Sequence, residues 1–175
     1  MKKGVVNLNQ LDQLMAELVQ MGDGVKKVVL RSIDALVNRN YQEALEIINE
    51  DDLIDNQLIV IEEKTTRLLA EQNPKGKELR CSLSIFKLAK DLERIGDYAN
   101  NISEIALELK NEEYIKPLTH ISQMSALVVN MLDVSLKSFV DGNTDLAEAV
   151  CRKDEEADNL YEEIYNELTQ MMTNP

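Results

Sequence analysis

The 175-residue sequence contains few of the residues that break or cross-link a chain: 6 Gly, 3 Pro, 2 Cys and no Trp. An all-β sandwich needs turn residues about every 8–12 positions, so this scarcity excludes that fold class and favours long helices. Cys81 and Cys151 have no C-x-x-C spacing, which argues against a disulfide framework or a zinc–cysteine motif. We expect both cysteines to be buried small apolar residues.

The sequence also lacks the residues of common catalytic relays and of membrane insertion. His120 is the one histidine, which limits the possible chemistry: the sequence offers no candidate His–Ser or His–Cys relay of the usual kind, so an enzyme would have to use carboxylates and metals. No stretch approaches the roughly 18 uninterrupted apolar residues of a membrane span. The opening Met1–Gly4 is not followed by the apolar core of a signal peptide. We therefore expect a soluble, cytoplasmic protein with no direct membrane insertion and no catalytic activity.

Acidic residues dominate what is present. The chain has 32 Asp and Glu against 19 Lys and Arg, a formal net charge of −13. Binding to nucleic acid requires a basic stripe that releases counterions, and the sequence has none. An acidic chain instead suggests a basic protein partner, divalent cations or simply solubility.

Hydrophobic periodicity predicts five helices, over about 8–38, 41–72, 77–110, 118–140 and 144–173. Asn40 begins the second with Glu43 as its capping-box partner, and Pro74 ends it. Ile85 to Leu109 form an apolar seam with a regular three–four spacing in the third helix. A helix of this length spans about 50 Å. The sequence therefore predicts an all-α, elongated bundle.

The chain contains an internal repeat. A shift of 103 residues superposes the fourth and fifth predicted helices on the first and second without a gap, with Met124 on Met21 and Asn143 on Asn40. We therefore predict a first three-helix repeat over 1–112 and a second, incomplete one over 117–175. A copy of the third helix would start near position 180. The missing helix is thus expected either outside this sequence or from another source.

Acid pairs four residues apart occur at the same place in both repeats. Asp51 and Asp154 occupy positions on an apolar seam, and Asp55 and Asp158 flank them one turn later. An ionised carboxylate on such a seam is costly unless a cation pairs with it. One interpretation is a salt bridge, because Lys26 and Lys27 lie across from Asp51 in a helical hairpin. Asn130 and Met131, which carry no positive charge, lie across from Asp154.

The other interpretation is a metal ion, which two such pairs on neighbouring helices can bind jointly. Glu93 and Asp97 supply a further pair four residues apart in the third helix, on its outer face. They could equally be a solvated face neutralised by Arg94. Gly96 costs about 1 kcal/mol in a helix, which suggests that another backbone or an ion approaches closely. Open coordination positions at such a site could admit phosphate.

The sequence at these acids resembles the PhoU family of bacterial phosphate-signalling proteins. The stretch 90–102, which reads KDLERIGDYANNI, is similar to the characteristic third-helix motif of that family, and Met21-Gly22, Asp51-x-x-Ile54-Asp55 and Leu79-Arg80 support the match. The resemblance implies two three-helix repeats with acidic E(D)-x-x-x-D motifs that bind iron or zinc clusters; manganese and magnesium are further possibilities for carboxylate sites. Carried over, the metal ligands are Asp51, Asp55, Glu93, Asp97, Asp154 and Asp158.

The resemblance further implies an adaptor and negative regulator. Its partners would be the ATPase subunit of the phosphate ABC transporter and a sensor histidine kinase of the phosphate-starvation response. The absent final helix departs from the family, so we expect an exposed apolar face and a homo-oligomer. A PhoU-like domain of a sodium/phosphate symporter and a metal-free helical interaction domain are the alternatives. A ferritin-like enzyme would need Glu-x-x-His pairs, which are absent.

Overall fold

The computed structural model describes residues 8–173, and these residues form helices and connections without a strand. Met1–Gly4 and Pro175 lie outside the described residues. The helices are α1 (Leu8–Asn38), α2 (Tyr41–Asn49), α3 (Asp52–Gln72), α4 (Lys77–Glu108), the short 3₁₀ helix η1 (Leu109–Asn111), α5 (Thr119–Asp141) and α6 (Thr144–Thr173). The predicted all-α fold is confirmed.

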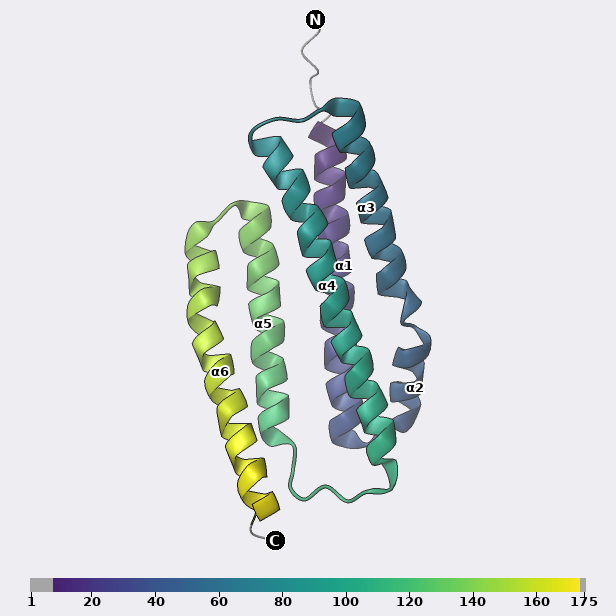
Figure 1. The fold of residues 1–175 in the computed structure, drawn as a ribbon, viewed down its shortest axis with the longest axis vertical. Helices are drawn as coiled ribbons and strands as arrows, with labels where there is room; N and C mark the ends of the chain where they lie inside the picture. Colours follow the sequence, from purple (N-terminus) through teal and green to yellow (C-terminus); the bar gives the residue numbers. More distant parts are fainter. Residues whose placement is uncertain (1–7, 174–175) are drawn as a thin grey trace, which may run out of the picture.

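The helices lie side by side in an elongated bundle (Figure 1). α4 packs against α1, α2 and α3, while α5 packs against α1 and α6 packs against α5. The connection from α4 to α5 crosses one end of the molecule, so that α5 and α6 lie beside the first four helices. The main core joins α1, α3, α4 and α5, and its best-buried members include Leu18, Met21, Val25, Ile61, Ile85 and Ala89.

The predicted helix over 41–72 is wrong in one respect, because it is divided into α2 and α3 at Glu50 and Asp51. Glu50, Asp51 and Asp52 form a run of acids, and Asp favours helix N-termini over helix interiors. Asp52 and Asp55 accordingly lie in the first turn of α3. Placing them there gives both carboxylates a favourable interaction with the positive end of the helix dipole.

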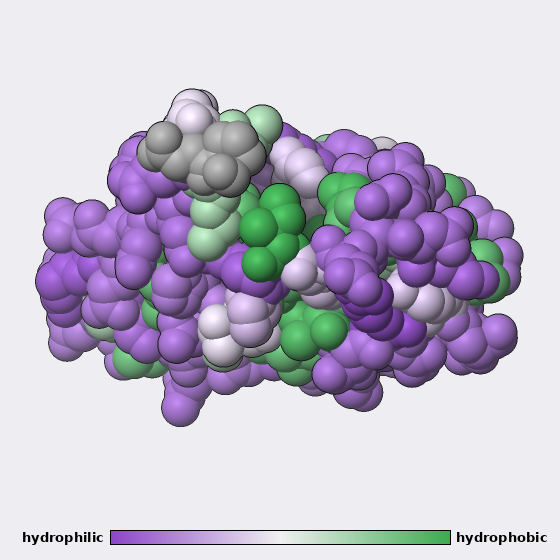
Figure 2. All heavy atoms as spheres, turned by 90° about the horizontal axis from the view of Figure 1, so that it is seen from below, coloured by the Kyte–Doolittle hydropathy of each residue, from purple (hydrophilic) through white to green (hydrophobic). Residues whose placement is uncertain are grey.

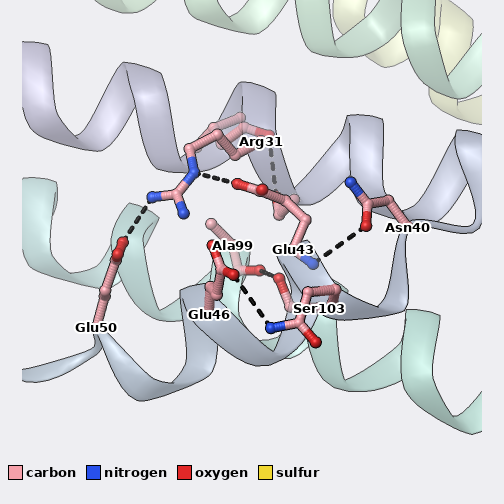
Figure 3. A network of polar contacts seen from close by, with 10 residues as sticks. Arg31, Asn40, Glu43, Glu46, Glu50, Ala99 and Ser103 are labelled. Carbon is pink, nitrogen blue, oxygen red and sulfur yellow. Dashed lines mark hydrogen bonds and ion pairs between the residues drawn. The ribbon is translucent and has the colours of Figure 1, made fainter.

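Arg31 of α1 holds both ends of the short α2 (Figure 3). Its guanidinium donates to the Glu43 carboxylate in the first turn and to Glu50 Oε2 at the C-terminal end, the latter over 2.6 Å. The N-terminal cap predicted from the sequence is also present, since Asn40 Oδ1 accepts a hydrogen bond from the Glu43 backbone N–H. These contacts orient α2 and therefore fix where α3 begins.

The 103-residue offset reappears in the ends of the helices. α1 ends at Asn38 and α5 at Asp141, while α2 starts at Tyr41 and α6 at Thr144. Asn143 caps α6 as Asn40 caps α2, accepting hydrogen bonds from two backbone N–H groups of the first turn. α6 differs from its counterpart in running without interruption.

α6 is the least buried of the long helices. Ile164 is its one buried residue, whereas α4 has eight. The expectation that both cysteines are buried is therefore wrong for Cys151 of α6, which is exposed, and Cys81 of α4 is half-buried. Among the described helices, none combines the length and apolar character needed to cross a membrane.

Candidate metal centre

Three carboxylates from α3 and α4 converge on one point. Asp55, Glu93 and Asp97 each place an oxygen within 4.8 Å of the others. Glu93 and Asp97 share a face because they are four residues apart on α4, and the packing of α3 on α4 adds Asp55. The sequence placed Glu93 on an outer face, but its side chain is only 13% exposed. Glu93 is thus enclosed at the contact between α3 and α4.

Asp51, the fourth carboxylate predicted here, lies next to this cluster at the N-terminal end of α3. Its Oδ1 accepts a hydrogen bond from the Asn100 side-chain amide of α4. Asp51, Asp55, Asp97 and Asn100 together line a cavity of about 30 Å³. A water molecule needs roughly 10–15 Å³ of such space, so the cavity has room for one water molecule or a small cation.

A salt bridge does not account for Asp51. Lys26 instead pairs with Asp133 and, at 2.9 Å, with Asp23. The nearest counter-charge to the cluster is Lys90, whose Nζ lies 2.7 Å from Glu93 Oε1, so Lys90 takes the part that the sequence suggested for Arg94. One lysine cannot balance four carboxylates, and the site keeps a net negative charge.

The acids destabilise one another in their charged forms. Burial raises the pKa of Asp55, and the Asp51 and Glu93 carboxylates raise it further. Burial and the Glu93 and Asp55 charges likewise raise the pKa of Asp97. For Asp51, burial again is the main cause of a raised pKa, followed by the charge of Asp97. A bound cation would remove the repulsion that all three groups share.

Two buried oxygens at the site accept no hydrogen bond from the described residues: Glu93 Oε2 and Asn100 Oδ1. A buried acceptor without a partner is costly and marks a place where a water molecule or an ion completes the structure. Carboxylate and amide oxygens suit hard and borderline cations. The donor set, the cavity and the unpartnered oxygens therefore all fit a metal ion.

Gly96 allows α3 and α4 to approach at this site. A Cβ at Gly96 would lie 2.9 Å from Cδ1 and 3.4 Å from Cγ2 of Ile54. The neighbour of this glycine is thus a side chain of α3, where the sequence suggested a backbone or an ion. Ile54 precedes Asp55, so the close contact also sets the position of the Asp55 carboxylate.

The second acid pair stands apart. Asp154 and Asp158 lie on the exposed surface of α6, and within residues 8–173 they belong to no group of three convergent metal-binding side chains. Their counterparts in the first repeat are completed by α4, and the described residues place no equivalent helix beside α6.

Asn100 and Lys90 are members of the site that the sequence reasoning missed. Asn100 follows Glu93 by seven residues and Lys90 precedes it by three, so both lie on the same face of α4. That spacing was a usable signal for both residues.

A model of the PhoU domain family matches two segments of the chain, residues 18–106 and 121–175. A phosphate-specific transport system accessory protein PhoU homolog of Aquifex aeolicus is 35% identical, over 91% of this chain and 72% of its own length. A protein of the same name from Clostridium acetobutylicum is also 35% identical, over 94% of this chain and 76% of its own length.

Two solved structures share the fold. The crystal structure of PhoU from Pseudomonas aeruginosa aligns with a TM-score of 0.89 and 30% identity, covering 95% of this chain and 81% of that one. The crystal structure of the phosphate transport system regulatory protein PhoU from Streptococcus pneumoniae aligns with a TM-score of 0.87 and 29% identity, covering 94% and 77%.

Proposed function

Because this chain belongs to the PhoU family, we propose that it is a cytoplasmic accessory protein of phosphate transport that acts through metal-loaded acidic surfaces and protein contacts. Proteins of this family are named as accessory and regulatory proteins, and this chain is likewise not an enzyme. The convergence of Asp55, Glu93 and Asp97 is the observation that carries the metal-binding part of this proposal.

The metal would be held by Asp55, Glu93 and Asp97, with Asp51 and Asn100 beside it. Iron and zinc are the first candidates, and manganese and magnesium suit the same oxygens. A cation bound by these residues would supply positive charge between α3 and α4 and could hold phosphate oxygens. The chain's own residues fix the geometry: Gly96 and Ile54 bring the two helices together, and Lys90 holds Glu93 in place.

We also propose Asp154 and Asp158 as ligands of a second metal site, which would require further ligands from elsewhere. They repeat Asp51 and Asp55 in sequence, but they lie exposed on α6 without a convergent third acid among the described residues. Any metal at this pair would need donors from a helix that covers α6. We therefore expect the first-repeat site to bind more tightly.

For the signalling role, we propose that the protein contacts the ATPase subunit of the phosphate ABC transporter and a sensor histidine kinase. Such contacts would damp the phosphate-starvation response when phosphate is plentiful. The support is the family membership together with relatives that are named for the phosphate-specific transport system.

Elemental analysis by mass spectrometry tests the metal part. Protein is purified without an affinity metal, and wild type is compared with Glu93→Gln, with Asp154→Asn and with the matched control Asp91→Asn. Asp91 is an exposed acid on the same helix and outside the convergent group. We expect about one metal ion or more per chain in wild type, in the control and in Asp154→Asn, and a loss of most of that bound metal in Glu93→Gln.

A reporter of the phosphate-starvation response tests the regulatory part separately, in a bacterium whose own PhoU has been deleted. Wild type is expected to repress the reporter at high phosphate. If every protein is metal-free and wild type still represses, the metal proposal is wrong and the adaptor proposal stands. If wild type binds metal but does not repress the reporter, the adaptor proposal is wrong and the metal proposal stands.

A further inference from the structure

Lys90 places a positive charge at the edge of the proposed metal site. Its Nζ lies 2.7 Å from Glu93 Oε1, and the two residues share a face of α4 because they are three positions apart. Burial and neighbouring acids raise the pKa of Asp55 and of Asp97, and the Lys90 charge opposes both shifts. The ammonium therefore neutralises part of the same negative charge that a metal ion would neutralise.

The setting of Lys90 differs from that of an ordinary surface lysine. Hydrophilic side chains cover most of the surface, as the end of the molecule in Figure 2 illustrates, and ion pairs on such a surface contribute little. Lys64 and Lys116 form pairs of this kind with single acids of α1 and α6. The acid that Lys90 contacts belongs instead to a group of three convergent carboxylates. A cation that enters this group has to compete with Lys90.

A metal ion and the Lys90 ammonium cannot both stay beside Glu93 without strong repulsion. A metal bound by Glu93 would lie about 2.0–2.2 Å from a carboxylate oxygen, and the ammonium lies 2.7 Å from the same carboxylate. Like charges this close repel one another even where solvent weakens the interaction. The metal would carry more charge and would also gain contacts with Asp55 and Asp97. The metal is thus the stronger competitor, and the ammonium has to move.

Glu62 of α3 offers the ammonium a second partner. The contact with Glu93 is the main cause of the raised pKa of Lys90, and the charges of Asp97 and Glu62 contribute to it. Glu62 is therefore within electrostatic reach of Lys90, and it is half-buried and outside the convergent group. The Lys90 side chain is 53% exposed and has a flexible four-carbon stem. It can thus change its partner without a movement of either helix.

We propose that Lys90 is an exchangeable counter-cation, which pairs with Glu93 until a metal ion binds there and then transfers to Glu62. This proposal rests on the metal-binding function proposed above and adds the residue that limits its affinity. Displacing the ammonium costs the same for every ion, whereas the attraction to the three carboxylates grows with the charge of the ion. Lys90 therefore lowers the affinity for all metal ions and restricts net binding to divalent and trivalent ones.

Metal titrations of the 175-residue protein test the exchange. Protein is stripped with EDTA, the chelator is removed by dialysis, and zinc and manganese are added separately in an isothermal titration calorimeter. We expect Lys90→Met to bind both ions about fivefold more tightly than wild type, or more. The matched control Lys87→Met removes the same charge from an exposed position one turn away on α4. Because solvent screens that charge, we expect the control to change the affinity by less than about twofold.

A double-mutant cycle tests the role of Glu62. Glu62→Gln should weaken metal binding about threefold in the wild-type background, where Lys90 loses its second partner, and much less in the Lys90→Met background. Glu63→Gln removes the next, exposed acid of α3 and should have equal effects in both backgrounds. Melting temperatures in EDTA establish that each variant folds. Lys90→Met should melt at a lower temperature than wild type there, because it leaves the repulsion among the carboxylates uncompensated.

Three results would overturn the exchange while the metal-binding proposal stands. Weaker binding by Lys90→Met would mean that Lys90 stays on Glu93 and positions its other oxygen. Equal gains in Lys90→Met and Lys87→Met would mean that net charge alone sets the affinity. Equal effects of Glu62→Gln in both backgrounds would mean that Glu62 does not receive the ammonium. If neither wild type nor Lys90→Met binds either ion, both proposals are wrong. Binding by Lys90→Met alone would support the competition and contradict metal binding by wild type.

Discussion

At the scale of single residues, the acidic cluster couples stability to pH. Asp51, Asp55 and Asp97 have raised pKa values because partial desolvation and the charges of neighbouring acids disfavour their ionised forms, although only Asp55 is half-buried and the other two are exposed. Between the usual aspartate pKa of about 3.9 and the raised values, the folded protein binds more protons than the unfolded chain. The contribution of these groups to the free energy of unfolding therefore increases as the pH falls through the raised pKa values.

We predict that this contribution is visible in the metal-free protein. In EDTA, raising the pH from 5 to 7 should lower the melting temperature of wild type more, or raise it less, than that of Asp55→Asn/Asp97→Asn. The variant lacks two of the titrating groups. Asp12→Asn/Asp91→Asn alters the net charge equally at exposed acids outside the cluster and should follow wild type. Identical pH profiles for all three proteins would contradict the electrostatic account of the site.

The sequence predicts six acids as metal ligands, and the structure brings four of them together. The difference arises because sequence spacing does not show which residues of a neighbouring helix lie across from each acid. Spacing along a helix shows that Glu93 and Asp97 share a face, and the seam shows that Asp51 and Asp55 point toward another helix. The residue across from each acid depends on how the helices pack. Lys26 therefore pairs with Asp133, which lies 107 positions away in sequence.

At the scale of helices, Gly96 tests how closely α3 and α4 must approach. Ala in place of Gly inside a helix gains about 1 kcal/mol of intrinsic propensity. At Gly24 a new Cβ would lie 3.9 Å from its nearest neighbour, so we predict the full gain for Gly24→Ala. At Gly96 the 2.9 Å approach to Ile54 Cδ1 offsets it, and we predict a smaller gain or a loss for Gly96→Ala.

Denaturant unfolding of a double-mutant cycle checks the cause. In an Ile54→Val background, which lacks the Cδ1 atom, Gly96→Ala should recover most of the gain seen at Gly24. Metal affinity measured on the same proteins should fall where the free energy of unfolding falls, since Ile54 adjoins Asp55. Equal effects of Gly96→Ala in the two backgrounds would show that Ile54 is not the constraint.

The short α2 gives a second prediction at this scale. Arg31→Met removes two ion pairs, to Glu43 and to Glu50, and leaves both carboxylates without their cation. The three side chains are 25–43% exposed, so solvent screens the pairs, and we expect a loss of only about 1 kcal/mol in the free energy of unfolding. Arg31→Lys should lose less, because one ammonium can keep one of the two contacts. If Arg31→Met leaves the free energy of unfolding unchanged, the Asn40 cap and helix packing alone fix α2.

The division between α2 and α3 marks where periodicity stops being informative. The apolar pattern continues across Glu50–Asp52, and for that reason it predicts one helix over 41–72. The equivalent segment of α6 keeps the pattern and remains continuous. The two segments differ in the contacts that surround them, since Arg31 and Asn100 hold the acids of the first, and such contacts are not encoded in the spacing of apolar residues.

At the scale of the whole molecule, α6 should be the part that opens most readily. Ile164 is the one buried residue of α6, and α6 packs against α5. Glu167 of α6 also forms an ion pair with Lys116 of the α4–α5 connection. α4 has eight buried residues and packs against α1, α2 and α3. Local opening requires little free energy where few buried contacts are lost. The structure therefore predicts a stable unit of α1–α4 and a separately opening α6.

Amide hydrogen exchange measures this difference along the chain. We predict that amides in the middle of α4 exchange only through global unfolding, while those of α6 exchange at least tenfold faster, and that Ile164→Ala accelerates α6 without changing α4. Equally slow exchange in α4 and α6 would show that α6 unfolds together with the rest of the bundle.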